Sequence, residues 1–441
     1  MTRHVLAPAV VVLLALPGMV RAQSSPQAAT PQGSELRLDT LQRSAVETDP
    51  RFRELRLYES QADLRVANIS AEMKPTISVD GLLQYQSDVP TPPPFVPGGQ
   101  PLFLPPKGTV DASARLDQRI YDPTIGPRIA VEKARLAESQ ARTRTALFAL
   151  RQDVNDAFFA AALLQERSRA LAATLAELEA RLQETNVRVR EGAALASDAA
   201  AVEAALLQRR QDDDALRANR VAALKRLSNL TGRELTDADV LVAPDLNVAV
   251  AEARRRSDVR DRPEFVQFAR TQDRLARERD AAANQDRPRL SAFAKGGVGR
   301  PGLNFISDEF EVYGLAGIQL HWKAWTWGAS GRETRALELQ QEIATADEAA
   351  FKKALARTTE TDTTSIDRLQ RALSLDDRIV DLREQIVRTS EVRFREGALT
   401  ASEYVDRSTD LLEARFARAG HQVELAEASA RFLTSLGLEV R

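Results

Sequence analysis

The sequence contains no cysteine and only three histidines among its 441 residues. The absence of cysteine excludes disulfides, thiolate metal sites and cysteine nucleophiles. With so few histidines, a histidine-based zinc site or a Ser-His-Asp triad is disfavoured, and we expect no enzyme activity and no cofactor. The 61 basic and 63 acidic side chains give a net charge of −2, so the basic bias of a nucleic-acid-binding protein is missing.

The N-terminal sequence has the features of an export signal. An apolar run at residues 5–16 follows a basic start and leads to small residues around Ala22, which predicts a cleaved signal peptide at 1–22. The run is too short for a membrane anchor. No cysteine follows the cleavage point, so we expect no N-terminal lipid anchor, and residues 23–35 are expected to be a flexible leader.

Proline and glycine are scarce in two long tracts. No proline lies between Pro127 and Pro244, and none follows Pro301. These tracts are rich in Ala, Leu, Glu, Arg and Gln, with apolar residues at near-heptad spacing, which predicts long coiled-coil-like helices. A helix over 128–190 measures about 95 Å at 1.5 Å per residue. An ordinary helical bundle is the alternative, but this length favours a rod or a tunnel.

Four segments alternate between apolar and polar residues, the second pair more weakly than the first, and predict strands at 75–87, 109–121, 288–298 and 311–322. A Pro-rich loop (88–108) and a second loop (299–310) separate them in pairs. Each strand has about the length of a tilted bilayer-spanning strand, and one face is apolar, as in a sheet between lipid and water. A soluble sandwich stays open as the alternative. The polar face is expected to carry Asp80, Gln84, Asp111, Arg115, Asp117 and Arg119.

The two halves of the chain repeat each other. Residues 187–193 match 392–398 at an offset of 205 without a gap. We therefore expect a first repeat at 36–232, a linker at 233–245 and a second repeat at 246–441, each ordered helix, strand, loop, strand, long helix, turn, helix. Four strands cannot close a barrel, and lipid does not tolerate an open edge. If the strands span a membrane, several chains must share one barrel.

The doubled Arg-Glu-Gly-Ala turn, the Arg-Pro-Glu-Phe helix start at 262–265 and the Leu-Thr-Gly helix end at 230–232 resemble the TolC-like outer membrane efflux proteins. The resemblance covers about 36–437. It implies an α+β membrane protein that forms a homotrimer in the outer membrane of a Gram-negative bacterium. Its twelve-stranded β-barrel would continue into a periplasmic α-helical tunnel. It also implies a passive channel of a tripartite efflux or type I secretion system, with a periplasmic adaptor protein and an inner-membrane pump as partners.

Turns at 192–197 and 397–402 interrupt the long helices. Gly192 and Gly397 suit a left-handed C-cap, and Ser197, Thr400 and Ser402 are candidates to cap the following helices. Thr400 and Glu403 have the spacing of a capping box. A simple helix-turn-helix tip explains the pattern, whereas the resemblance implies that these turns dock the adaptor.

Acidic residues follow both turns: Glu403 and Asp406 after the second, and Asp198 after the first. By the resemblance, threefold symmetry would turn each carboxylate into a ring of three that constricts the tunnel entrance and attracts cations. The alternative is a solvated helix face.

All three tryptophans, Trp322, Trp325 and Trp327, cluster where the last strand ends. This placement suits an interfacial aromatic belt against outer membrane lipid, with packing against the helices as the alternative. Here the sequence departs from the family, which usually has a Pro-Leu-Phe-like segment.

Two other functions compete with the channel. A periplasmic coiled-coil scaffold or adaptor would share the long helices but does not explain the strands. An exported enzyme would need convergent carboxylates, and the run Asp212-Asp213-Asp214 sits on a helix, where consecutive side chains diverge.

Overall fold

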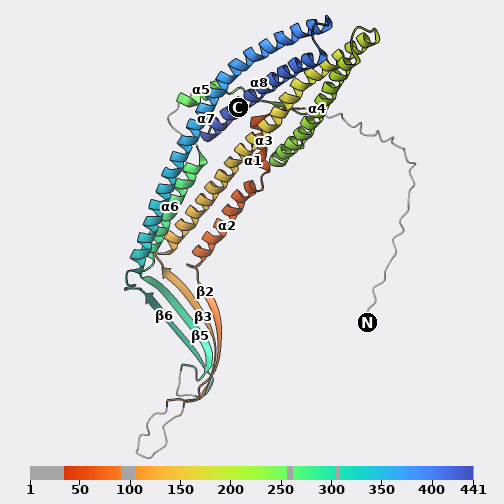
Figure 1. Cartoon of the computed structure of the whole chain (residues 1–441). Coiled ribbons are helices and arrows are strands. Elements are labelled where there is room, and N and C mark those ends of the chain that lie inside the picture. Colours follow the sequence, from red (N-terminus) through yellow and green to blue (C-terminus); the bar gives the residue numbers. More distant parts are fainter. Residues whose placement is uncertain (1–33, 91–104, 256–261, 304–307, 441) are drawn as a thin grey trace, which may run out of the picture.

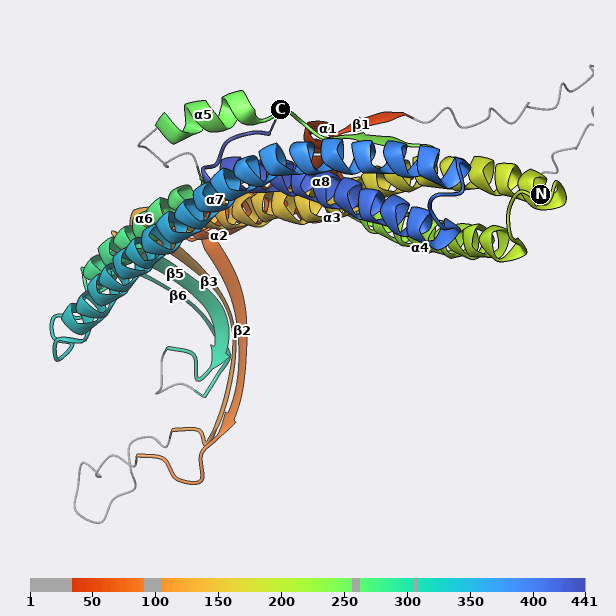
Figure 2. The same cartoon turned by 45° about the horizontal axis from the view of Figure 1, so that its top comes forward.

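The chain forms a long rod, in which helices continue from a curved sheet (Figures 1 and 2). The computed structural model describes residues 34–90, 105–255, 262–303 and 308–440. The expected signal peptide, the leader up to residue 33 and parts of both strand-connecting loops lie outside these residues. No described helix is both long and apolar enough to span a bilayer.

The sheet consists of four antiparallel strands. They are β2 (Thr76–Tyr85), β3 (Gly108–Tyr121), β5 (Arg289–Arg300) and β6 (Glu311–His321), hydrogen-bonded in the order β2-β3-β5-β6. A bulge between Arg119 and Tyr121 shifts the register where β3 leaves the sheet. β2 and β6 are the edge strands, and neither has a second neighbouring strand among the described residues.

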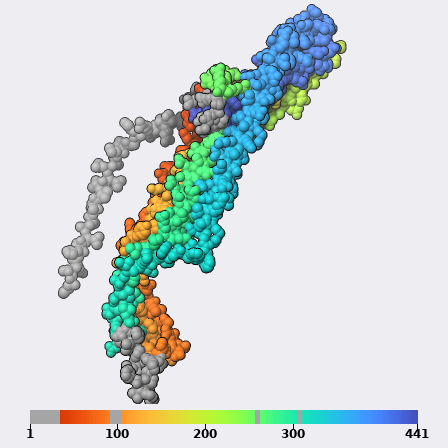
Figure 3. Space-filling model, turned by 90° about the vertical axis from the view of Figure 1, so that its left-hand side faces the viewer, coloured from red at the N-terminus to blue at the C-terminus, as the bar shows by residue number. Residues whose placement is uncertain are grey.

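Four helices extend from the sheet, side by side in the same order as its strands. They are α2 (Arg51–Ala71), α3 (Ile125–Arg190), α6 (Pro263–Asn284) and α7 (Ala329–Arg395), each packed against the next. α3 and α7 have 66 and 67 residues, so each is about 100 Å long. Neither contains proline beyond its first turn, and α7 runs along the visible face of the rod (Figure 3).

At the far end each long helix turns back. α4 (Ala196–Thr231) packs along α3, and α8 (Ala401–Ser435) packs along α7. α3 also packs against α8, which joins the first repeat to the second. The ends of α3 and α7 differ by 205 residues, as do the starts of α4 and α8, so the offset read from the turns describes the helices as well.

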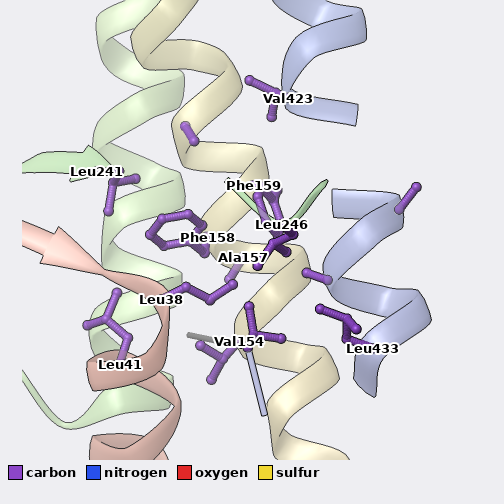
Figure 4. Packing of buried hydrophobic residues seen from close by; sticks show 14 of the residues in the cluster. Leu38, Leu41, Val154, Ala157, Phe158, Phe159, Leu241, Leu246, Val423 and Leu433 are labelled. Carbon is purple, nitrogen blue, oxygen red and sulfur yellow. The ribbon is translucent and has the colours of Figure 1, made fainter. Parts of the chain in front are cut away.

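The main hydrophobic core lies midway along the rod. Phe158 and Phe159 of α3 are buried there together with Leu433 of α8 and with Leu38 and Leu41 of α1 (Leu38–Thr48; Figure 4). The two phenylalanine rings meet edge to face at 5.2 Å. Because the middle of α3 is apolar on several faces, it holds elements of both repeats around itself.

Two short strands complete this core. β1 (Glu35–Arg37) pairs in parallel with β4 (Val240–Val242), and α5 (Asn247–Arg255) follows. β1 includes Glu35, the last residue of the expected leader, and β4 lies within the expected linker at 233–245. Both strands have three residues, too few to show an alternating pattern.

Candidate functional site

The sheet has one polar and one apolar face. Cross-strand pairs such as Ser78–Arg115, Asp80–Ser113 and Gly297–Tyr313 share the polar face. All six residues expected on that face lie there by register: Asp80, Gln84, Asp111, Arg115, Asp117 and Arg119. The other face carries exposed apolar side chains, among them Ile77, Val79, Leu83, Val110, Leu116, Val312 and Ile318.

The charges on the polar face are largely paired. Arg115 lies 2.8 Å from Asp117 and stacks 4.9 Å from the centre of the Phe293 ring. Asp111 accepts a hydrogen bond from the Tyr313 hydroxyl and lies 3.5 Å from the Lys295 ammonium. This face is therefore polar but close to neutral, with acids and bases interleaved.

Glycines on β5 and β6 make room for this network. A Cβ at Gly297 would lie 2.7 Å from the Ala112 carbonyl and 2.9 Å from the Tyr313 hydroxyl. A Cβ at Gly317 would lie 3.0 Å from the Phe293 ring. The large polar-face side chains therefore lie over glycines of the neighbouring strands.

The three tryptophans follow β6 at the junction with α7. Trp322, Trp325 and Trp327 are 61%, 76% and 80% exposed, so packing against this chain's own helices does not account for them. Trp325 and Trp327 meet edge to face at 5.8 Å. By parity, Trp322 continues the apolar face that contains Ile318 and Leu320.

The two helix-turn-helix tips lie beside each other at the far end of the rod (Figure 1). Gly192 and Gly397 adopt φ of +75° and +74°, the left-handed conformation that glycine tolerates. A cleft of about 510 Å³ between the tips is lined by residues of both turns, including Arg188, Leu195, Phe394 and Leu399.

The turns are shorter than expected. α4 begins at Ala196 after an N-cap at Leu195, and α8 begins at Ala401 after an N-cap at Thr400. Ser197 and Ser402 therefore lie inside helices, and their proposed capping role is wrong. In both repeats the N-cap residue lies three places before an acidic residue. The carboxylate of that acidic residue accepts a hydrogen bond from the backbone amide of the N-cap residue, which fixes where the helix begins.

Two of the three residues predicted to form the gate, Glu403 and Asp198, instead accept hydrogen bonds from the N-cap residues. Glu403 accepts hydrogen bonds from the Thr400 amide at 3.0 Å and hydroxyl at 2.9 Å, and the Thr400 amide holds the pKa of Glu403 below its usual value. Asp198 accepts from the Leu195 amide at 3.2 Å. The Asp406 side chain is exposed and forms no hydrogen bond or ion pair within the described ranges.

One cluster near the tips was missed in the sequence. The tip latch consists of Glu177 and Arg181 of α3, Glu391 of α7 and Tyr404 of α8. The buried Tyr404 hydroxyl donates to Glu177, and burial together with this carboxylate raises the pKa of Tyr404. Arg181 stacks 5.2 Å from the Tyr404 ring and lies 2.6 Å from Glu391.

The signal for the latch in the sequence is weak. Arg181 directly precedes Leu182 and leaves the apolar heptad series Leu171, Leu175, Leu178 and Leu182 unbroken, although its side chain is buried. A lone charged residue within a coiled-coil seam needs a partner, because burying an unpaired charge is costly. The partner, however, lies more than 200 residues away in the other repeat, where the pattern does not point to it.

Comparison with known proteins identifies this architecture. Residues 41–233 match the family model of the outer membrane efflux proteins. The outer membrane channel OprN is 17% identical, with a TM-score of 0.66 over 91% of this chain and 89% of its own. CusC, described as forming a transmembrane channel, is 12% identical with a TM-score of 0.69 over 92% and 93%.

The CmeC outer membrane channel of Campylobacter jejuni is 13% identical, with a TM-score of 0.66 over 91% of this chain and 85% of its own. A search of curated protein sequences found no significant relative. The chain resembles the TolC-like outer membrane efflux proteins in sequence over its first repeat and in fold over nearly its whole length.

Proposed function

We propose that this protein is the outer membrane channel of a tripartite efflux or type I secretion system. It conducts cargo passively from the periplasm to the exterior, and an inner-membrane pump supplies the energy. The observation that carries the proposal is the sheet, which is polar on one face, apolar and exposed on the other, and open at both edges. The helices continue it in the same order.

The open edges support a homotrimer. Backbone groups on β2 and β6 need partners in lipid, since no water is available to satisfy them. Three copies of four strands give a closed barrel of twelve, and the helices below would then close into a periplasmic tunnel.

The two faces then have separate roles. Asp80, Asp111, Arg115 and their neighbours line a water-filled lumen, while the apolar face contacts lipid. Trp322, Trp325 and Trp327 mark the periplasmic membrane boundary, where indole rings are favoured. Because acids and bases alternate in the lumen, this part of the channel has weak ion selectivity.

The tips supply the contact to the rest of the system. Gly192, Gly397 and Thr400 shape the two turns that dock a periplasmic adaptor, and Ser197 and Ser402, in the first turns of α4 and α8, flank them. Asp406, Glu403 and Asp198 form acidic rings at the tunnel entrance. The chain reaches the outer membrane through the signal peptide at 1–22.

A periplasmic scaffold function does not explain an amphipathic sheet with two open edges. The enzyme alternative is disfavoured because Asp212 and Asp213 lie in separate ion pairs with Arg209 and Arg217. These carboxylates therefore do not converge on a substrate.

The test is the oligomeric mass of the purified protein in detergent, followed by single-channel conductance in a planar bilayer. A trimer with a small conductance, which rises in the Glu403→Ala/Asp406→Ala double variant, is expected. A trimer whose conductance does not change in the variant would keep the channel and remove the acidic gate. A water-soluble monomer that never inserts would move the scaffold to first place.

A further inference from the structure

Two helices of the second repeat meet end to end midway along the rod. α6 and α8 each pack against both α3 and α7, α6 in the half next to the sheet and α8 in the half next to the tips (Figure 1). α8 ends at Ser435 and α6 begins at Pro263. The contacts at this joint therefore set the position of the α7–α8 hairpin, which carries the second tip, relative to the half of the rod next to the sheet.

Arg262, the N-cap residue of α6, contacts all four helices at the joint. Its guanidinium donates to the Ser435 carbonyl of α8 at 3.2 Å and forms two hydrogen bonds to Glu264 of α6. It also lies 5.4 Å from the centre of the Phe148 ring of α3 and 5.4 Å from that of the Phe351 ring of α7. A planar guanidinium suits this position, because it donates from its edge while its faces contact aromatic rings.

The first repeat closes the equivalent joint through α1. The last carbonyl of α4, that of Thr231, accepts hydrogen bonds from the hydroxyls of Ser44 at 2.8 Å and Thr48 at 3.2 Å. At an offset of 213, which aligns the prolines at the starts of α2 and α6, Asp49 takes the place of Arg262. A carboxylate there cannot donate to a carbonyl. The second joint therefore depends on a side chain that the first joint does not need.

α7 crosses the joint with a segment that bends easily. Five of its threonines donate a side-chain hydrogen bond to the carbonyl four residues earlier: Thr358, Thr359, Thr361, Thr363 and Thr364. Bonds of this kind often bend a helix. At the offset of 205, the last two threonines take the places of Phe158 and Phe159, which hold α3 in the main core. The core therefore fixes α3 at its joint, whereas the direction of α7 depends on the contacts around Arg262.

We propose that Arg262 is the positioning residue of the second tip. It fixes the angle between the α7–α8 hairpin and the half of the rod next to the sheet, and α7 bends within its threonine segment when this angle changes. The first tip does not depend on Arg262, because α1 and the main core hold its helices. The proposal rests on the channel proposed above, in which both tips lie at the tunnel entrance.

The absence of native cysteine allows a test by spin labelling. A single label is placed on an introduced cysteine at Ala398 in the second tip, at Ala193 in the first tip or at Ala346 in the half of α7 next to the sheet, all of which are exposed. Pulsed dipolar EPR measures the distances between labels on different copies of the detergent-purified oligomer. The test variant is Arg262→Gln. The matched control is Arg418→Gln, which removes the same charge from an ion pair within the α7–α8 hairpin.

In Arg262→Gln we expect the Ala398 distance to shift and its distribution to broaden, while the Ala193 and Ala346 distances stay as in the wild type. Arg262→Lys should give the same shift, because an ammonium keeps the charge but cannot form the same hydrogen bonds and ring contacts. Phe351→Leu removes one ring and should give a smaller shift, which tests the proposal if Arg262→Gln does not assemble. Arg418→Gln should leave all three distances unchanged.

A lower thermal midpoint of Arg262→Gln with an unchanged Ala398 distance would show that Arg262 only stabilises the fold, and would overturn the proposal. Full rescue by Arg262→Lys, or equal shifts at Ala398 and Ala193, would overturn it too. In each of these cases the oligomer remains and the channel stands. A protein that stays monomeric in detergent gives no distance between copies and overturns the channel as well.

Discussion

The Glu384 carboxylate of α7 accepts a hydrogen bond of 2.9 Å from the Arg415 guanidinium of α8. At the offset of 205, Glu179 of α3 accepts the same bond from Arg210 of α4 at 2.8 Å. The duplication therefore preserves an ion pair across each helix hairpin. The surroundings differ, since the Glu384–Arg415 pair is more shielded from solvent than the Glu179–Arg210 pair.

Glu384→Gln should destabilise the folded chain at neutral pH by under about 1 kcal/mol, because half-exposed ion pairs are screened by solvent. The Arg415 hydrogen bond lowers the pKa of Glu384 from its ordinary 4.5. A lowered acid pKa contributes stability above the unfolded value, and this stability disappears as the pH falls through the folded pKa.

The difference in thermal midpoint between wild type and Glu384→Gln, measured in detergent, should therefore shrink as the pH falls below 4.5. The matched variant Glu179→Gln should show a smaller difference at neutral pH, because its pair is more exposed. An equal or larger effect of Glu179→Gln would contradict this ranking.

Local patterns in the sequence predict the regular elements because each depends on neighbouring residues. The strand that contains Val110, Ala112 and Ala114 alternates with period two, and Gly192 marks the end of α3. Pairing between distant segments leaves no such pattern, as the β1–β4 contact and the Arg181–Tyr404 contact show. The residue type of Ser197 predicts an N-cap there, but the N-cap is Leu195, because the Asp198 carboxylate accepts a hydrogen bond from the Leu195 amide.

Tyr404→Phe tests the hydroxyl of the tip latch. The change removes the hydrogen bond to Glu177 and should cost about 1 kcal/mol in stability, while the ring stays stacked on Phe394 at 5.6 Å. Tyr404→Ala also removes the buried ring and should cost about 3–5 kcal/mol. Unfolding of the detergent-solubilised protein measures both, and equal losses for the two variants would show that the ring contributes nothing.

The left-handed turn glycines should not tolerate a side chain. Gly192→Ala and Gly397→Ala force φ near +75° on a residue with a Cβ, which costs roughly 1–2 kcal/mol each. Gly420→Ala is the control: this glycine lies inside α8, and nothing lies within 4 Å of its added Cβ. It should stabilise the protein by about 0.4–1 kcal/mol. Thermal midpoints that shift in the same direction for all three variants would contradict the left-handed conformation assigned to Gly192 and Gly397.

Gly297→Ala should disturb the sheet, because its Cβ would meet backbone at 2.7 Å and the Tyr313 hydroxyl at 2.9 Å. Overpacking of this kind typically costs about 1–3 kcal/mol. Gly314→Ala adds the same methyl group where the nearest atom is 4.0 Å away and should be neutral. The yield and thermal midpoint of the assembled protein compare the two, and a neutral Gly297→Ala would show that β5 shifts to make room.

The acidic rings can be tested without disturbing the cap. Glu403→Ala removes both a charge and the hydrogen bonds to Thr400, whereas Glu403→Gln removes the charge and keeps a side chain that suits the capping box. Asp406→Asn removes only a charge, since Asp406 has no partner among the described residues. We therefore expect the Glu403→Gln/Asp406→Asn variant to unfold at the wild-type temperature and to lose cation preference, measured as reversal potential across a salt gradient. Asp214→Asn, an exposed acid farther along α4, should leave the reversal potential unchanged. An unchanged reversal potential in the double variant would show that both acids belong to a solvated helix face and form no gate. The role of Glu403 would then be only to cap the start of α8.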